Sequence, residues 1–188
     1  METKSELRNT YRAKRRRLST DERSKLSLSI AQQVIDYLDD QSHIKNIHVF
    51  LPISKLNEVN TFPMIERLLQ KKLTLYTSAT DFSTQEMATI KLIAPLNTEE
   101  DEFGIPVPVL RESAELNDIQ MVLIPLLAYD LEGNRLGYGM GFYDKFLESL
   151  PPVVKAGVSF FPPEKVIPSE IHDIKLDICF TANQVYLF

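Results

Sequence analysis

The sequence holds a single cysteine, Cys179, so no disulfide can form within the chain. This cysteine lies in an apolar, strand-like run and is expected to be a core residue, and such cysteine usage fits a reducing compartment. No apolar run approaches the roughly 20 residues that a membrane-spanning helix needs. The N-terminal residues are charged and lack the apolar segment of a signal peptide. We therefore expect a cytoplasmic protein without membrane contact.

An excess of positive charge is also missing. The chain has 26 Asp and Glu residues against 21 Lys and Arg residues, for a net charge of −5, which argues against nucleic-acid binding by the molecule as a whole. The charge is nevertheless uneven, because residues 4–17 are strongly basic. Such a segment suits a small anionic ligand or forms a solvated helix face. A third reading is a regulatory or nucleic-acid-binding module, which would bind polyanions in a salt-sensitive way and turn over no ATP.

Repeats, low-complexity segments and linker-like stretches are absent as well. The 188 residues, 44% of them hydrophobic, suit one globular domain, 1–188. Capping-box patterns at 3–6 and 19–22 predict two helices, so residues 1–40 are expected to form an N-terminal helical pair. Further helices are predicted at 61–72 and from about 141 to 150.

Apolar runs between these helices predict strands. They lie at 47–53, 73–76, 87–93, 119–124, 153–158, 178–181 and 185–188, and residues 103–108 are expected to form a loop. Strands interleaved with helices predict an α/β class with a mostly parallel central sheet.

The most informative segment is 134–144, with the sequence NRLGYGMGFYD. Glycines alternate at 137, 139 and 141 between a polar loop and a predicted helix, and such a loop can turn successive backbone N–H groups toward an anion. The Rossmann pattern is excluded because position 142 is Phe, and the Walker A pattern because no Gly-Lys-Ser/Thr follows. Phosphate binding and a tight strand-to-helix connection both fit the glycines.

Two charged residues bracket these glycines. Arg135 can hold a phosphate with two parallel hydrogen bonds. Asp144 stands where a carboxylate could share Mg²⁺ with ATP oxygens. Its other reading is a helix N-terminal charge. The two residues together strengthen the case for phosphate binding, and the tight strand-to-helix connection stays an alternative.

Residues 134–144 resemble the N-R-L-G-x-G-x-G-[FY]-Y-D signature of the 5-formyltetrahydrofolate cyclo-ligase family. Residues 4–8 (KSELR), Ile53 with 57–59 (NEV), and 172–177 (HDIKLD) resemble other family elements in the same order, so the resemblance covers nearly the whole chain. It implies a fold like that of the NagB/RpiA/CoA-transferase group. It also implies ATP- and Mg-dependent conversion of 5-formyltetrahydrofolate to 5,10-methenyltetrahydrofolate, with release of ADP and phosphate.

The resemblance implies a role for each matching residue. Those implied to bind ATP are Lys4, Arg8, Asn134, Arg135, Leu136, Gly137, Tyr138, Gly139, Met140, Gly141 and Phe142. Those implied to bind folate are Ile53, Glu58, Phe142 and Tyr143, those implied to be catalytic are Arg135 and Tyr143, and those implied to hold Mg²⁺ are Asp144 and Asp173. Without the resemblance, Lys4 and Arg8 read as a solvated basic face, Glu58 as a surface acid and Asp173 as a turn residue.

The remaining cations of the basic segment, residues 14–17, are expected to be surface charge. The expected partners are a folate substrate and ATP, and a monomer is expected. The alternative enzyme class is a sugar-phosphate isomerase or CoA-transferase-like enzyme on a related α/β fold, which fold alone does not exclude. That class needs no ATP and leaves Lys4, Arg8 and Arg135 without a shared purpose.

Overall fold

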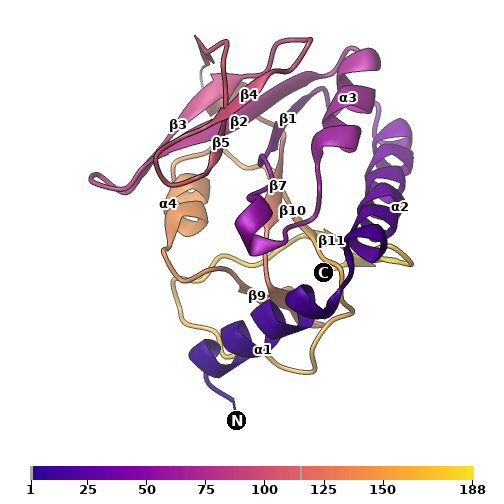
Figure 1. Cartoon of the computed structure of the whole chain (residues 1–188), viewed down its shortest axis with the longest axis vertical. Helices are drawn as coiled ribbons and strands as arrows, with labels where there is room; N and C mark the ends of the chain where they lie inside the picture. Colours follow the sequence, from indigo (N-terminus) through magenta and orange to yellow (C-terminus); the bar gives the residue numbers. More distant parts are fainter. Residues whose placement is uncertain (1, 115) are drawn as a thin grey trace.

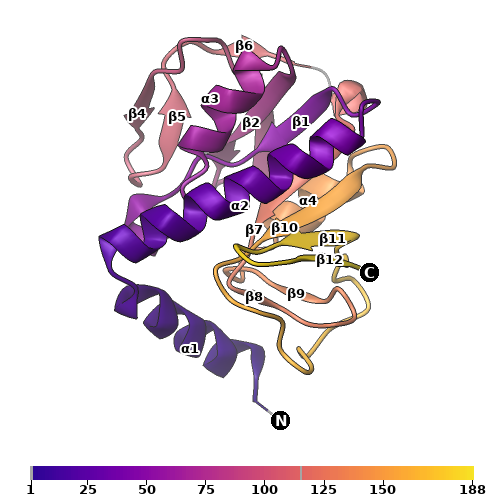
Figure 2. The same cartoon turned by 90° about the vertical axis from the view of Figure 1, so that its right-hand side faces the viewer.

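The computed structural model describes residues 2–114 and 116–188. An eight-stranded sheet with strand order β12-β11-β10-β7-β1-β2-β3-β6 forms its centre (Figures 1 and 2). Its strands are β1 (Asn46–Val49), β2 (Thr74–Asp81), β3 (Glu86–Lys91), β6 (Glu112–Ser113), β7 (Met121–Pro125), β10 (Val154–Val158), β11 (Ile178–Phe180) and β12 (Val185–Leu187). The five central strands are parallel, and β3, β6 and β12 pair antiparallel at the edges. The predicted α/β class with a mostly parallel sheet is confirmed.

Helices cover both faces of this sheet, which explains why its central strands are apolar on both sides. The helices are α1 (Lys4–Arg17), α2 (Thr20–Asp40), α3 (Phe62–Gln70) and α4 (Phe142–Glu148), and η1 (Ser54–Leu56) and η2 (Leu116–Asp118) are short 3₁₀ turns. In β7, Leu123 packs with the α2 and α3 side of the core, whereas Val122 and Ile124 pack with Phe146 of α4. This alternation follows the two-residue period of a strand. Figure 2 shows α2 crossing one face of the sheet, with α4 behind the strands.

The first helix lies apart from these layers, below the sheet in Figure 1. Both α1 and α2 begin at complete capping boxes, on Thr3 and Ser19. Leu7 and Tyr11 of α1 pack against a small antiparallel hairpin formed by β8 (Ala128–Tyr129) and β9 (Arg135–Leu136). The α1 helix therefore lies against the loop that follows β7. Cys179 of β11 is fully buried, as its apolar surroundings predict.

Some local predictions differ from the structure. The predicted loop at 103–108 contains β5 (Pro106–Pro108), which pairs with β4 (Thr98–Glu100). The short strands β4, β5, β6, β8 and β9 have two or three residues each, too few for a periodic pattern to reveal. The predicted strand at 47–53 ends at Val49, because the chain then turns away into η1.

The connections after the parallel strands position the site. The carboxyl ends of parallel strands lie at one edge of a sheet, where α/β proteins commonly bind ligands. Residues 50–58 follow β1 and residues 126–141 follow β7, and these two strands are direct neighbours. Within the described ranges, no helix is both long enough and apolar enough to cross a membrane.

Candidate functional site

A cavity of about 410 Å³ lies at this edge of the sheet. Its walls come from α1, the segment after β1, the β2–β3 hairpin, the β4–β5 loop and the glycine-rich segment after β9. The structure brings nearly all predicted site residues to this cavity: Lys4, Arg8, Ile53, Glu58, Arg135, Leu136, Gly137, Tyr138, Gly139, Met140, Gly141, Phe142, Tyr143, Asp144 and Asp173. Residues 169 positions apart in the chain, Lys4 and Asp173, meet here.

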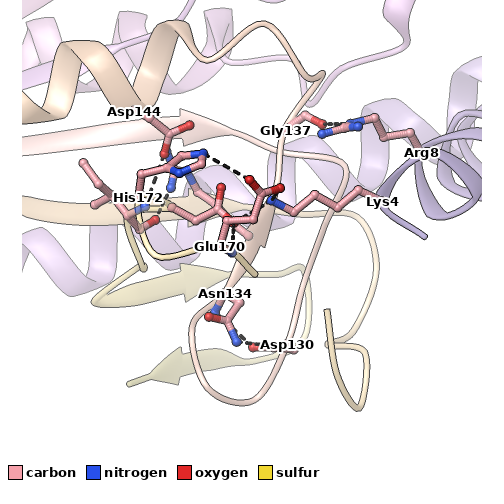
Figure 3. A network of polar contacts seen from close by, with 11 residues as sticks. Lys4, Arg8, Asp130, Asn134, Gly137, Asp144, Glu170 and His172 are labelled. Carbon is pink, nitrogen blue, oxygen red and sulfur yellow. Dashed lines mark hydrogen bonds and ion pairs between the residues drawn. The ribbon is translucent and has the colours of Figure 1, made fainter. Parts of the chain in front are cut away.

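The glycine-rich segment follows the cavity wall with an unusual backbone. Gly139 has φ +99° and Gly141 has φ +73°, in the left-handed region that favours glycine. A Cβ at Gly139 would lie 3.1 Å from the guanidinium carbon of Arg8, so this glycine also permits the close approach of α1. Arg8 Nε donates to the carbonyl oxygen of Gly137 at 3.0 Å (Figure 3). A Cβ at Gly137 or Gly141 would meet no described atom within 4 Å, so the backbone there is open to a ligand.

Arg135 and Asp144 form an ion pair inside the cavity wall. Arg135 Nη2 lies 2.6 Å from Asp144 Oδ1, and the Arg135 side chain is only 5% exposed. Arg135 Nη1 also donates to the carbonyl oxygen of Ile174, and the Ile174 N–H donates to Asp144 at 3.2 Å. The pair is therefore fixed by three elements: β9, α4 and the segment before β11. The guanidinium of Arg135 is thus held in one orientation at the cavity wall.

A second ion-pair group joins α1 to the same C-terminal segment. Lys4 Nζ lies 2.6 Å from Asp173 Oδ2 and 3.0 Å from Glu170 Oε1, and His172 lies 3.4 Å from Glu170 (Figure 3). Burial opposes ionisation of Asp173, but the hydrogen bonds from Lys4 and Glu170 N–H outweigh it and lower its pKa. Burial likewise opposes the charge of Lys4, and its two carboxylate partners raise its pKa. Both groups are therefore ionised at neutral pH.

Glu58 is buried in another part of the cavity wall and is not a surface acid. Its Oε2 accepts from the Ile53 N–H at 2.7 Å, and its Oε1 accepts from the Tyr138 hydroxyl. Burial raises the pKa of Glu58, and Tyr138, the Ile53 N–H and the charge of Arg15 oppose that rise. A buried carboxylate facing a cavity is a strong acceptor for ring N–H and amino groups.

Tyr143 stands beside this wall and packs against both layers of the core. Burial raises the pKa of Tyr143 well above its ordinary value of 10, and the charge of Glu58 adds to this effect. Its hydroxyl therefore stays protonated and can donate a hydrogen bond, but it cannot serve as a general base near neutral pH.

Arg15 corrects a prediction, because this residue is not surface charge. It is 2% exposed, and its guanidinium donates to the Tyr138 hydroxyl and to the Leu126 carbonyl oxygen, each at 2.6 Å. The spacing Leu7, Tyr11, Arg15 could have indicated this, because residues four apart share one helix face. The basic composition of the segment masked that pattern.

Asn134 lies outside the cavity lining. Its side-chain amide donates to Asp130 Oδ2 at 2.8 Å, and its backbone N–H donates to Asp130 Oδ1 at 3.0 Å (Figure 3). Asp130 also accepts from the Ile167 N–H. In this structure Asn134 stabilises the turn between β8 and β9.

Two aromatic side chains that line the cavity, Phe82 and Phe103, were not predicted from the sequence. The Phe82 ring centroid lies 4.7 Å from that of Phe103 and 5.4 Å from that of Phe142. Phe82 follows β2 and Phe103 lies in the β4–β5 loop. Neither position carries a motif, so only the tertiary structure could place them at the cavity.

Asp144 and Asp173 suit a metal ion only if a bound nucleotide supplies further oxygen ligands. Across residues 2–114 and 116–188, no three His, Cys, Asp or Glu side chains are grouped to hold a cation. Asp144 engages its partners through Oδ1 and Asp173 through Oδ2, so each has a second oxygen to offer. Mg²⁺ commonly binds one or two carboxylates and completes its shell with phosphate oxygens and water. The donor types fit Mg²⁺ bound together with a nucleotide.

Several known proteins are similar to this chain in sequence and in fold. A model of the 5-formyltetrahydrofolate cyclo-ligase family matches residues 1–182. A 5-formyltetrahydrofolate cyclo-ligase of Mus musculus is 28% identical over 187 residues, covering 91% of this chain and 89% of the relative. One of Haemophilus influenzae is 26% identical over 149 residues, covering 78% of each chain.

Two solved structures are similar along almost the entire chain. The 5,10-methenyltetrahydrofolate synthetase of Aquifex aeolicus has a TM-score of 0.82 at 30% identity, covering 98% of this chain and 92% of its own. That of Mycoplasma pneumoniae has a TM-score of 0.78 at 27% identity, covering 97% and 100%. The chain belongs to the 5-formyltetrahydrofolate cyclo-ligase family, enzymes whose reaction is the ATP-dependent cyclisation of 5-formyltetrahydrofolate to 5,10-methenyltetrahydrofolate.

Proposed function

We propose that this chain uses ATP and Mg²⁺ to cyclise 5-formyltetrahydrofolate to 5,10-methenyltetrahydrofolate, and that it does so by phosphorylating the formyl oxygen. The observation that carries this proposal is that one cavity has both a wall suited to phosphate, called the phosphate wall, and a wall suited to folate, called the folate wall. Open glycine backbone, Lys4 and Arg8 form the first wall. Buried Glu58 and protonated Tyr143 form the second. The mostly parallel sheet with helices on both faces also supports a NagB/RpiA/CoA-transferase-like fold.

The chemistry requires a better leaving group than an amide-type oxygen. The formyl oxygen attacks the γ-phosphorus of ATP, the bond from that phosphorus to the β–γ bridging oxygen breaks, and ADP leaves. The nitrogen at position 10 of the folate then attacks the activated formyl carbon and loses its proton. The ring closes, and the former formyl oxygen departs in inorganic phosphate. The protein contributes mainly positioning and charge stabilisation, as in phosphoryl transfer generally.

On the phosphate wall, each residue has a task that its geometry supports. Backbone N–H groups of residues 137–141 and the cations Lys4 and Arg8 bind phosphate oxygens. Arg135, pre-oriented by Asp144, bridges the transferred phosphate and the formyl oxygen. Asp144 and Asp173 would hold Mg²⁺, which when bound neutralises charge on the ATP oxygens.

On the folate wall, Glu58 accepts hydrogen bonds from the amino and ring N–H groups of the pterin. Ile53 and Phe142 contribute apolar surface along the flat substrate, and both line the cavity. Tyr143 donates its hydroxyl proton in a hydrogen bond without releasing it. These contacts orient the formyl group toward the phosphate wall.

Purified protein mixed with 5-formyltetrahydrofolate, ATP and Mg²⁺ is expected to produce the near-ultraviolet absorbance band of methenyl-folate. Controls omit one component at a time, and the band should require both ATP and Mg²⁺. Folded protein that yields no band under any of these conditions would refute the proposal. A screen of phosphorylated sugars and CoA esters would then test the isomerase or transferase alternative.

Lys4→Ala is expected to raise the apparent KM for ATP about tenfold or more, because a hydrogen bond to a charged group contributes about 1.5–3 kcal/mol. The KM for folate should change much less. Steady-state kinetics with each substrate varied in turn measures both. Arg16→Ala is the matched control, since Arg16 is an exposed cation on the same helix. An unchanged ATP KM in Lys4→Ala would remove Lys4 from the phosphate wall.

A further inference from the structure

The inward face of α1 carries more than the two cations of the phosphate wall. Lys4, Arg8, Tyr11 and Arg15 stand at helical spacings of three and four residues and share one face of the helix. Lys4 and Arg8 line the cavity near the glycine-rich segment. Arg15 lies about two turns further along, beneath the wall that contains Glu58. One helix thus reaches both halves of the site.

Arg15 is a buried cation without a carboxylate in direct contact among the described residues. Its Nη2 donates to the Leu126 carbonyl oxygen at 2.6 Å, and its Nη1 contacts the Leu56 carbonyl oxygen at 3.4 Å. Its Nε has no hydrogen-bond partner within residues 2–114 and 116–188. Burying a charge without an oppositely charged partner is costly. The third contact of the guanidinium, from Nη1 to the Tyr138 hydroxyl at 2.6 Å, connects Arg15 to the carboxylate of Glu58.

That contact determines the direction of a proton. A tyrosine hydroxyl has one hydrogen, whereas a guanidinium has donors only and no acceptor. Arg15 must therefore donate to the Tyr138 oxygen, and the single Tyr138 proton is free to point only at Glu58. The Tyr138 hydroxyl accordingly donates to Glu58 Oε1. The chain Arg15 to Tyr138 to Glu58 has one polarity, with Glu58 as its final acceptor.

We propose that Arg15 is a positioning residue for the folate wall, which orients the Tyr138 hydroxyl toward Glu58 and keeps Glu58 a charged acceptor when folate enters. This inference rests on the proposed function. It assigns to α1 a second task beside phosphate binding, because the same helix that presents Lys4 and Arg8 to ATP stabilises the acceptor for the pterin.

The charges around Glu58 support this role. The titratable and charged groups that face Glu58 are Arg15 from α1, Tyr138 from the glycine-rich segment and Tyr143 from α4. Burial raises the pKa of Glu58, while the Tyr138 hydrogen bond, the Ile53 N–H and the Arg15 charge lower it. Removing the Arg15 charge therefore raises the pKa of Glu58 further, so that protonation begins at a higher pH.

Three variants test the positioning role of Arg15: Arg15→Gln, Arg15→Lys and the exposed-site control Arg16→Gln. For each variant, methenyl-folate formation is measured as a function of folate concentration, ATP concentration and pH. Arg15→Gln is expected to raise the folate KM about tenfold, to change the ATP KM less than about twofold, and to move the acid limb of kcat/KM for folate to higher pH. Arg15→Lys retains a cation and should remain within about threefold of wild type. Arg16→Gln should match wild type in every parameter.

The outcomes separate the two proposals. A wild-type protein that forms no methenyl-folate would refute the proposed function. If the wild type is active, an Arg15→Gln variant with an unchanged acid limb and an unchanged folate KM would overturn the role of Arg15. Equal increases in the folate KM and the ATP KM, without a shifted acid limb, would overturn it as well. If Arg15→Gln does not fold, Tyr138→Phe is the second variant. It removes the hydroxyl that links Arg15 to Glu58 and retains the cation. Its acid limb must then move to higher pH, and an unmoved limb would overturn the inference.

Discussion

Asp144→Asn is expected to lower kcat about 10²- to 10³-fold, the usual effect of removing one group that stabilises transition-state charge. Asparagine retains an oxygen that can accept from Arg135 and from the Ile174 N–H, contacts that Asp144 makes at 2.6 Å and 3.2 Å. The local packing should therefore persist while the carboxylate charge is lost. The requirement for Mg²⁺ should rise, because a proposed ligand to the cation becomes neutral.

Rate measurements over a range of Mg²⁺ concentrations, with circular dichroism as a check on folding, test this result. Asp39→Asn is a suitable control, because Asp39 pairs with Lys71 in an exposed position, where such pairs contribute little to stability. A folded Asp144→Asn variant with near-normal kcat and an unchanged Mg²⁺ requirement would remove Asp144 from the metal assignment.

Glu58→Gln is expected to raise the KM for 5-formyltetrahydrofolate about 10- to 100-fold, since hydrogen bonds to a charged acceptor contribute about 1.5–3 kcal/mol. The KM for ATP should change little, because Glu58 lies on the folate wall. Glu66→Gln on α3 is the matched control, as Glu66 is exposed. A folate KM within about twofold of wild type would show that Glu58 is not the pterin acceptor.

The pH dependence gives the same variant a second readout. Burial raises the pKa of Glu58 above its ordinary value of 4.5. Wild-type kcat/KM for folate should therefore fall as the pH drops through this raised pKa, and Glu58→Gln should lack that acid limb. Stability has the opposite sign. Between the unfolded and folded pKa values the native state binds more protons, so wild-type stability decreases as pH rises through this window.

The effects expected at Lys4 and Asp144 depend on the docking of the C-terminal segment 170–176, because both residues contact it. The segment is held on one side by Lys4 through Asp173 and Glu170, and on the other by Arg135 and Asp144 through Ile174. Contacts between segments far apart in the sequence therefore hold this part of the cavity wall together. Substitutions that abolish one of these contacts, such as Lys4→Ala, will therefore also weaken the docking of this segment.

The local character of the site could be predicted because its signals are contiguous. The glycines at 139 and 141 need no partner to adopt positive φ, and residues 3–6 and 19–22 contain both halves of their capping boxes. The apolar run ending in β7 likewise needs only its own composition to indicate a central strand. Hydrophobic periodicity could not reveal β8, β9 or the β4–β5 hairpin, because strands of two or three residues are too short to show an alternating pattern.

The α/β class, the glycine-rich segment and the chemical types at the site could be inferred from the sequence alone, because each depends on residues that are neighbours in the chain. Which charged side chains contact one another became clear only from the fold. Arg15 and Glu58 are as charged in the sequence as any surface residue, and it is burial against Tyr138 that makes them one network. Asn134 belongs to the signature, yet its hydrogen bonds to Asp130 hold a turn outside the cavity. Hydrogen bonding and desolvation depend on distances across the fold, which the order of residues along the chain does not contain.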